Sequence, residues 1–87
     1  MIEYASIVNL IKKSDKVIGL KQTLRSLEEN KLDCIVMAID SDEQFKEKII
    51  KSNKENVKTH VLLSKSELSS ICKLDVPCGV VGILKKN

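Results

Sequence analysis

Aromatic side chains are nearly absent from this chain of 87 residues, because Tyr4 and Phe45 are the only two and there is no tryptophan. Domains that bind single-stranded nucleic acid through an RRM or OB fold stack bases on several exposed rings. The scarcity of rings therefore disfavours both of those binding modes. If the chain binds RNA, we expect it to recognise a structured backbone and base edges instead.

Cysteines are too few and too scattered for the usual metal or disulfide frameworks. Cys34, Cys72 and Cys78 are odd in number and form no C-x-x-C pair, which argues against a zinc site and against a set of disulfides. Cys34 and Cys72 occupy apolar positions, where a thiol behaves as a small buried hydrophobe. We therefore expect no metal, no cofactor and a reducing, cytoplasmic compartment.

Long apolar runs are missing too. No run approaches the ~20 residues that a bilayer-spanning helix needs, and the first residues lack the basic region and cleavage site of a signal peptide. We expect no membrane partner and one compact domain over residues 1–87, with 43% hydrophobic and 31% charged residues. The net charge of +3 permits an RNA partner without requiring one.

The sequence contains no complete catalytic motif. It has no P-loop, no complete G-x-G-x-x-G and no nucleophile elbow. His60 is the only histidine and is predicted to lie in a strand, where a structural or surface role is commoner than a general base. Asp40 and Asp42 could hold a hard cation, but an Asp-Ser-Asp segment directly before a helix is more often a cap. We expect no catalytic residue.

Hydrophobic periodicity predicts four helices and four strands in strict alternation. The first two helices are expected over about residues 2–13 and 20–30. The third is expected from the Asp40-Ser41-Asp42 cap to near Asn53, and the fourth from a capping box at Ser64 and Glu67 onward. Strands are expected over residues 17–18, 34–39, 59–63 and 79–84. The unbroken apolar run of residues 34–39 is typical of a strand covered on both faces. This order predicts an α/β fold with a parallel or mixed sheet between helices.

Apolar residues at helical spacing predict which face of each helix is buried. They are Tyr4, Ile7, Val8 and Ile11 in the first helix, Leu20, Leu24 and Leu27 in the second, Phe45, Ile49 and Ile50 in the third, and Leu68, Ile71 and Cys72 in the fourth.

The stretch from Gly19 to Arg25 is the most informative part of the chain. A short apolar strand runs into the glycine, and a helix then opens with Lys21, Gln22 and Arg25 within one arc of its surface. Free backbone N–H groups and the positive end of the helix dipole attract anions at such a junction. The pattern indicates a phosphate-rich partner, and the alternative is an ordinary solvated helix face.

The segment between the fourth helix and the last strand is unusually apolar for a surface connection. Pro77 stiffens it and removes one backbone donor, while Val76 and Cys78 are both apolar. Either these side chains tuck beneath the loop, or they form an apolar lip against which an unstacked base rests.

Three segments together resemble the superfamily of kink-turn RNA-binding ribosomal proteins, which includes an archaeal large-subunit protein that is also the box C/D core protein, and small bacterial relatives. The family pattern G-[T/A]-[N/K]-[E/Q]-x-x-[K/R] resembles residues 19–25, whose Lys-Gln pair is like that of the bacterial branch. A second pattern, A-x-D-x-[D/E], resembles residues 38–42, and L-G-x-x-C-G-[I/V]-[E/D]-V-[P/G]-x-A resembles residues 68–79. The three segments occur in order and span nearly the whole chain.

The resemblance implies a three-layer α/β/α sandwich with a four-stranded mixed sheet. It also implies recognition of a kink-turn, an RNA in which a bulge beside tandem sheared G·A pairs bends the duplex sharply. Lys21 and Gln22 would contact the guanine edges of those pairs, and Arg25 would hold a guanine or a phosphate. Gly19 would let the helix end approach the RNA backbone, and Asp42 would face the extruded nucleotide.

The family likeness also gives a role to the apolar loop. Val76, Pro77 and Cys78 would cover the extruded nucleotide. The chain is then expected to be a monomeric, non-catalytic, bacterial RNA-binding protein that acts on ribosomal or regulatory RNA, with the ribosome among its partners and no DNA partner. The alternative is a protein-interaction module on the same fold, with weakened RNA binding.

Several differences from the family matter for affinity. Leu20 replaces a small threonine or alanine, and Ile39 replaces a residue that is often polar. Ser69 and Lys73 stand where glycine is common, and a lysine is strained if the latter position requires a positive φ.

Overall fold

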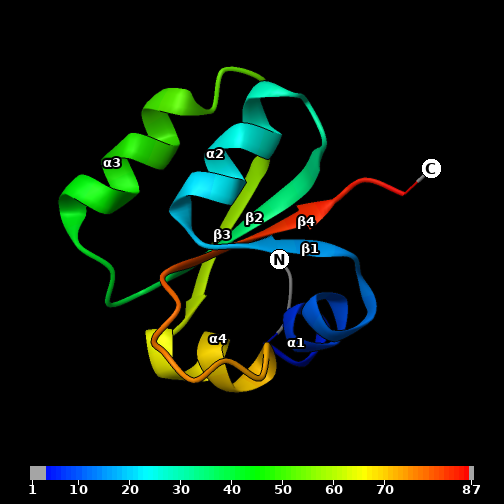
Figure 1. Ribbon diagram of the computed structural model, residues 1–87, viewed down its shortest axis with the longest axis vertical. Coiled ribbons are helices and arrows are strands. Elements are labelled where there is room, and N and C mark those ends of the chain that lie inside the picture. Colours follow the sequence, from blue (N-terminus) through cyan, green and yellow to red (C-terminus); the bar gives the residue numbers. More distant parts are fainter. Residues whose placement is uncertain (1–3, 87) are drawn as a thin grey trace.

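The computed structural model describes residues 4–86 and confirms the alternation of helices and strands (Figure 1). The elements are α1 (Tyr4–Lys13), β1 (Lys16–Ile18), α2 (Leu20–Glu28), β2 (Leu32–Ala38), α3 (Glu43–Ser52), β3 (Lys58–Leu63), α4 (Lys65–Ile71) and β4 (Val80–Leu84). Positions 2 and 3 of the first predicted helix lie outside the described residues. The second strand begins and ends earlier than predicted, so Ile39 belongs to the connection that follows it.

The four strands form one mixed sheet in the order β1-β4-β2-β3. Strand β4 is antiparallel to both β1 and β2, and β2 is parallel to β3. Figure 1 shows α2 and α3 on one face of the sheet and α1 and α4 on the other, which confirms the three-layer sandwich. This topology places the ends of β1, β2 and β3 and the start of β4 at one end of the sheet.

Two apolar clusters, one on each face of the sheet, make up the core. The central strand β2 serves both: Cys34, Val36 and Ala38 pack beneath α1 and α4, and Ile35 and Met37 pack beneath α2 and α3. All five side chains are buried, as the unbroken apolar run predicted.

Two helix positions predicted as core are largely exposed. Ile50 is 63% exposed because Phe45 and Ile49, one helical turn apart, already face the sheet, and Ile50 points away from them. Tyr4 is 52% exposed, and its hydroxyl donates a hydrogen bond to the carboxylate of Glu67, so it joins α1 to α4 by a polar contact.

The predicted caps are confirmed for α4 but not for α3. Ser64 accepts from the backbone N–H of Glu67, whose carboxylate accepts from the N–H of Ser64, so the capping box is complete. Asp42 occupies the N-cap of α3 without a side-chain capping bond. Asp40 instead accepts from the N–H of Lys65 at 2.9 Å, because parallel pairing brings the end of β2 beside the start of α4.

Helix α4 ends in a Schellman motif with a lysine in the left-handed region. The N–H of Leu74 donates to the carbonyl of Ser69 at 2.9 Å, and the N–H of Lys73 donates to that of Ser70 at 3.2 Å. Lys73 has a φ of +57°. The position therefore does require a positive φ, which a glycine adopts without strain.

We expect Lys73→Gly to raise the free energy of unfolding. A left-handed residue with a Cβ costs roughly 1–2 kcal/mol, and the extra freedom of glycine in the unfolded chain offsets roughly 0.5–1 kcal/mol of that gain. Urea unfolding should show a net increase of up to about 1 kcal/mol. Lys51→Gly, at an exposed position inside α3, is the control and should lose about 1 kcal/mol. A loss of stability in Lys73→Gly as well would contradict the strain.

A second stability test concerns Thr23, whose hydroxyl is completely buried on α2 and has no hydrogen-bond partner among the described residues. Thr23→Val keeps the shape and removes the unpaired group, so it should stabilise the fold by about 1 kcal/mol. Thr23→Ser keeps the hydroxyl and loses a methyl group, and it should destabilise. A loss of stability in Thr23→Val, measured by urea unfolding, would show that the hydroxyl is satisfied in solution.

Candidate nucleic-acid interface

The N-terminal end of α2 is an open helix end built on glycine. Gly19 is the N-cap residue and has a φ of +91° and a ψ of 164°, a conformation that is essentially restricted to glycine. Its N–H donates to the carbonyl of Val80 at 3.0 Å, which fixes the helix end against the start of β4. A Cβ built at Gly19 would meet nothing within 4 Å, so the space in front of this turn is open.

The three polar side chains predicted on this turn are all exposed. Lys21, Gln22 and Arg25 take part in none of the side-chain hydrogen bonds or ion pairs formed within residues 4–86. Leu20 and Leu24, on the opposite side of the helix, are half-buried and pack against the core cluster. Leu20 is therefore partly withdrawn into the core, and the polar arc remains free to meet a ligand.

Two consecutive carbonyl groups join the helix end to the neighbouring loops. The carbonyl of Gly79 accepts from the N–H of Ala38 at 2.8 Å and from the hydroxyl of Ser41 at 3.2 Å. The carbonyl of Val80 accepts from Gly19, as above, and from the thiol of Cys78 at 3.2 Å. These bonds bring the three predicted segments to one end of the sheet. We call the surface formed by Gly19, Lys21, Gln22, Arg25, Asp42, Val76 and Pro77 the α2-tip surface.

A small cavity of about 310 Å³ lies at this end of the sheet. It is lined by Ser41, Asp42, Phe45, Lys65, Pro77 and Gly79. Asp42 and Pro77 were predicted site residues, whereas Phe45 and Lys65 were not predicted to lie here. Phe45 was assigned to the core by its helical spacing. Lys65 lines the cavity only because α4 begins beside the end of β2.

The apolar loop after α4 is divided between surface and core. The hydroxyl of Ser69 lies within hydrogen-bonding distance of the carbonyls of Leu74 and Val76, at 3.1 and 2.7 Å, and holds the loop against α4. Val76 is 65% exposed and Pro77 is also exposed, as a surface lip requires.

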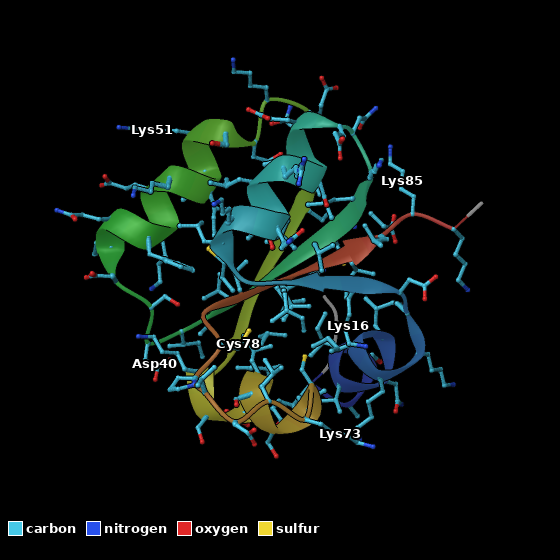
Figure 2. The ribbon with its side chains drawn as sticks, in the orientation of Figure 1. Lys16, Asp40, Lys51, Lys73, Cys78 and Lys85 are labelled. Carbon is cyan, nitrogen blue, oxygen red and sulfur yellow. The ribbon has the colours of Figure 1, made fainter. Side chains whose placement is uncertain are left out.

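The prediction that the side chain of Cys78 belongs to this lip is wrong. Cys78 is only 4% exposed, and Figure 2 shows it between the sheet and α4. Cys78 precedes β4 by two residues, and its side chain is part of the core cluster. Burial raises its pKa, so the thiol stays protonated.

Elsewhere the structure places a thiol near a histidine without the properties of a catalytic pair. Cys34 and His60 line one cavity of about 760 Å³, which Asp40 does not line. Burial, assisted by the charge of Asp33, raises the pKa of Cys34 to about 11, so this thiol is a poor nucleophile near neutral pH. Burial and the charge of Lys58 lower the pKa of His60.

Metal-binding clusters and membrane-spanning helices are both absent from the described part of the chain. Residues 4–86 contain no cluster of three or more His, Cys, Asp or Glu side chains that could hold a metal ion. None of the helices found there has the length and apolar character to cross a membrane.

Comparison with known proteins gives a consistent result at the levels of sequence and fold. An RNA-binding protein of Geobacillus thermodenitrificans is 37% identical over 70 residues, which cover 79% of this chain and 85% of the relative. The RNA-binding protein YbxF of Geobacillus stearothermophilus is 36% identical over the same shares of the two chains.

Among solved structures, a 15.5kD RNA binding protein of Giardia lamblia superposes with a TM-score of 0.78 at 21% identity. The match covers 100% of this chain and 79% of that one, and at this identity it supports the fold alone. The model of the ribosomal protein L7Ae/L30e/S12e/Gadd45 family matches residues 4–87. The chain therefore belongs to the ribosomal protein L7Ae/L30e/S12e/Gadd45 family.

Proposed function

We propose that this protein is a non-catalytic RNA-binding protein that recognises kink-turn structures in ribosomal or regulatory RNA. The observation that carries the proposal is the exposure of Lys21, Gln22 and Arg25, free of protein partners, on the open end of α2. Relatives at 36–37% identity are named RNA-binding proteins, which supports an RNA partner. We further propose that the protein acts as a monomer in the cytoplasm and that the ribosome is among its partners.

The chemistry of the polar arc fits guanine edges in a distorted groove. The ammonium group of Lys21 donates to guanine O6 and N7, and the amide of Gln22 both donates and accepts. The guanidinium of Arg25 binds a guanine edge or a phosphate through paired donors. The glycine at position 19 leaves the first helical turn accessible to the RNA backbone.

The cavity of about 310 Å³ at this end of the sheet suits the nucleotide that a kink-turn extrudes. Pro77 and Phe45 supply apolar atoms, and Lys65 and Asp42 supply a cation and a carboxylate. A base that leaves the stack can therefore find apolar contact and hydrogen-bonding groups in one place.

Binding would act on the RNA by shifting its population. A kink brings phosphates together and is repulsive, so a protein that binds only the kinked state shifts the equilibrium toward it. A change from 1:99 to 99:1 requires about 5.5 kcal/mol of differential affinity. A few charge-assisted hydrogen bonds, at roughly 1.5–3 kcal/mol each, are sufficient.

The direct test is a fluorescence titration of a labelled kink-turn RNA and of the same RNA with Watson–Crick pairs in place of the sheared pairs. We expect the kink-turn to bind at least about 30-fold more tightly, because the loss of two base contacts costs roughly 1–3 kcal/mol each. Equal affinity for both RNAs would leave non-specific charge attraction and would favour a protein-interaction module on this fold.

The site assignment is tested by the double substitution Lys21→Ala/Gln22→Ala. Both side chains are exposed, so the variant should unfold at the same urea concentration as the wild type while its preference for the kink-turn falls to near unity. Lys51→Ala removes the same charge from α3 and should keep the preference. An unchanged preference in the double variant would refute the assignment.

The proposed nucleotide site is tested by a double-mutant cycle. One change removes the extruded base from the RNA, and the other truncates side chains that line the cavity in the protein. An abasic substitution at the extruded nucleotide should weaken wild-type binding by about 10-fold, since stacking contributes roughly 1–3 kcal/mol per base. In the variant Lys65→Ala/Pro77→Ala the abasic substitution should have little further effect. Additive effects of the two changes would place the extruded base elsewhere.

A further inference from the structure

A second concave surface of the protein is lined by lysines that have no role in the proposed function. Lys12 at the end of α1, Lys16 at the start of β1 and Lys73 after α4 surround a cavity of about 450 Å³, with Ile71 and Cys72 as its remaining lining residues. Figure 2 shows Lys16 and Lys73 on the side of the sheet that carries α1 and α4, well away from Lys51 on α3. We call Lys12, Lys16 and Lys73 the lysine cluster.

The charges of the lysine cluster are not neutralised within the described part of the chain. The one ion pair among residues 4–86 joins Lys31 to Glu29, and the ammonium of Lys16 donates only to a backbone carbonyl, that of Ser14, at 3.4 Å. Of the nearby carboxylates, Asp15 lines a different cavity with Lys31, and Asp75 is exposed on the loop after α4. The cluster therefore presents concentrated positive charge to solvent.

Lys73 is the informative member of the cluster, because its backbone is strained. A cation near the C-terminal end of a helix is favoured by the dipole, which accounts for Lys12 in the last turn of α1. The same favourable charge could be placed in the last turn of α4 without a positive φ. Strain retained at an exposed residue points to a use for its side chain outside the fold.

Strand β1 and the loop after α4 connect the lysine cluster to the α2-tip surface. Lys16 and Gly19 are three residues apart along β1, a distance of about 10 Å at the rise of a strand. Within the sheet that residues 4–86 form, β1 is an edge strand and β4 is its one neighbour. The loop that carries Val76 and Pro77 to the α2-tip surface begins directly after Lys73. A ligand held at the α2 tip can therefore extend along the free edge of β1 to the cluster.

We infer that the lysine cluster binds the phosphate backbone of one duplex arm of the RNA whose kink is held at the α2-tip surface. The inference rests on the proposed function and adds a second contact region. This region recognises the charge of the phosphates and the spacing of the groove, and it carries no base specificity. Lysines that neutralise phosphates release counterions, so this contact should appear chiefly in the salt dependence of binding.

The test measures binding affinity over a series of salt concentrations for two kink-turn RNAs that share the same kink. In each of the two RNAs, a different one of the two duplex arms is shortened. Lys12→Gln/Lys16→Gln/Lys73→Gln should weaken binding of the RNA with the long contacting arm more than 10-fold at low salt. It should also reduce the slope of log affinity against log salt by about 2–3. With that arm shortened, the variant and the wild type should bind alike. Lys48→Gln/Lys51→Gln/Lys54→Gln removes the same charge near α3 and should leave the long-arm slope nearly unchanged.

The outcomes separate the two proposals. If the wild type shows no preference for a kinked RNA, the proposed function fails. If the preference is present but the cluster variant matches the control variant with every arm length, the inference alone is overturned. Equal losses with long and short arms would also overturn it, because they indicate an effect on the kink site itself.

Cys72 gives an independent readout within the wild-type protein. It lines the cluster cavity and is half-buried, whereas Cys34 and Cys78 are 5% and 4% exposed, so a thiol reagent should modify Cys72 first. Long-armed RNA should slow its alkylation several-fold, and short-armed RNA should not. Protection by both RNAs or by neither would contradict the proposed path.

Lys73→Gly separates strain from function. This variant should be as stable as the wild type or more stable, yet it should bind the long-armed RNA with a salt slope lower by about 1. If the variant binds the long-armed RNA with the wild-type affinity at every salt concentration, Lys73 does not contact the RNA.

Discussion

The backbone carbonyls of Gly79 and Val80 are the constraint on which the candidate surface depends. Each accepts two hydrogen bonds, and their four donors come from the start of α2, the end of β2, the loop before α3 and the turn into β4. Buried backbone groups must be paired, so these segments cannot separate without leaving polar atoms unsatisfied. The polar arc of α2 and the wall of the neighbouring cavity are thereby held in a fixed relation.

Gly79 is also required by space. A Cβ built there would lie 2.9 Å from Cζ of Phe45 and 3.3 Å from Oγ of Ser41. A side chain at this position would displace the ring that lines the cavity and the hydroxyl that binds the carbonyl. The glycine therefore allows α3 to close against the loop, and the same contact that packs the core also shapes the surface.

Much of this architecture could be predicted from the sequence, because local patterns specify it. The spacing of apolar residues gave the helices and the doubly covered strand β2, and the Ser64–Glu67 pair gave a complete capping box. The polar arc of α2 was predicted as exposed, and it is. Each of these features depends on residues that are close in the chain.

The features that were missed depend on residues far apart in the chain. Asp40 caps α4 instead of α3 only because β2 and β3 pair in parallel, which no local pattern specifies. The inward direction of Cys78, whose thiol donates to the carbonyl of Val80, depends on how the loop after α4 packs against the core cluster. The cavity residue Lys65 likewise requires the placement of α4 beside the end of β2, so the candidate site was predicted in outline and its lining was not.

The C-terminal ends of α2 and α4 show how the same backbone strain can be accommodated differently. Asn30 follows α2 with a φ of +55°, and asparagine tolerates that region; its side chain also accepts a hydrogen bond from Lys85 at 3.2 Å. Lys73 follows α4 with nearly the same φ, but its ammonium forms no hydrogen bond or ion pair within residues 4–86. At Asn30 the side chain stabilises the fold through this hydrogen bond, although its backbone is in a strained conformation. At Lys73 no such contact exists among the described residues, which agrees with the inferred use of its ammonium group by a ligand.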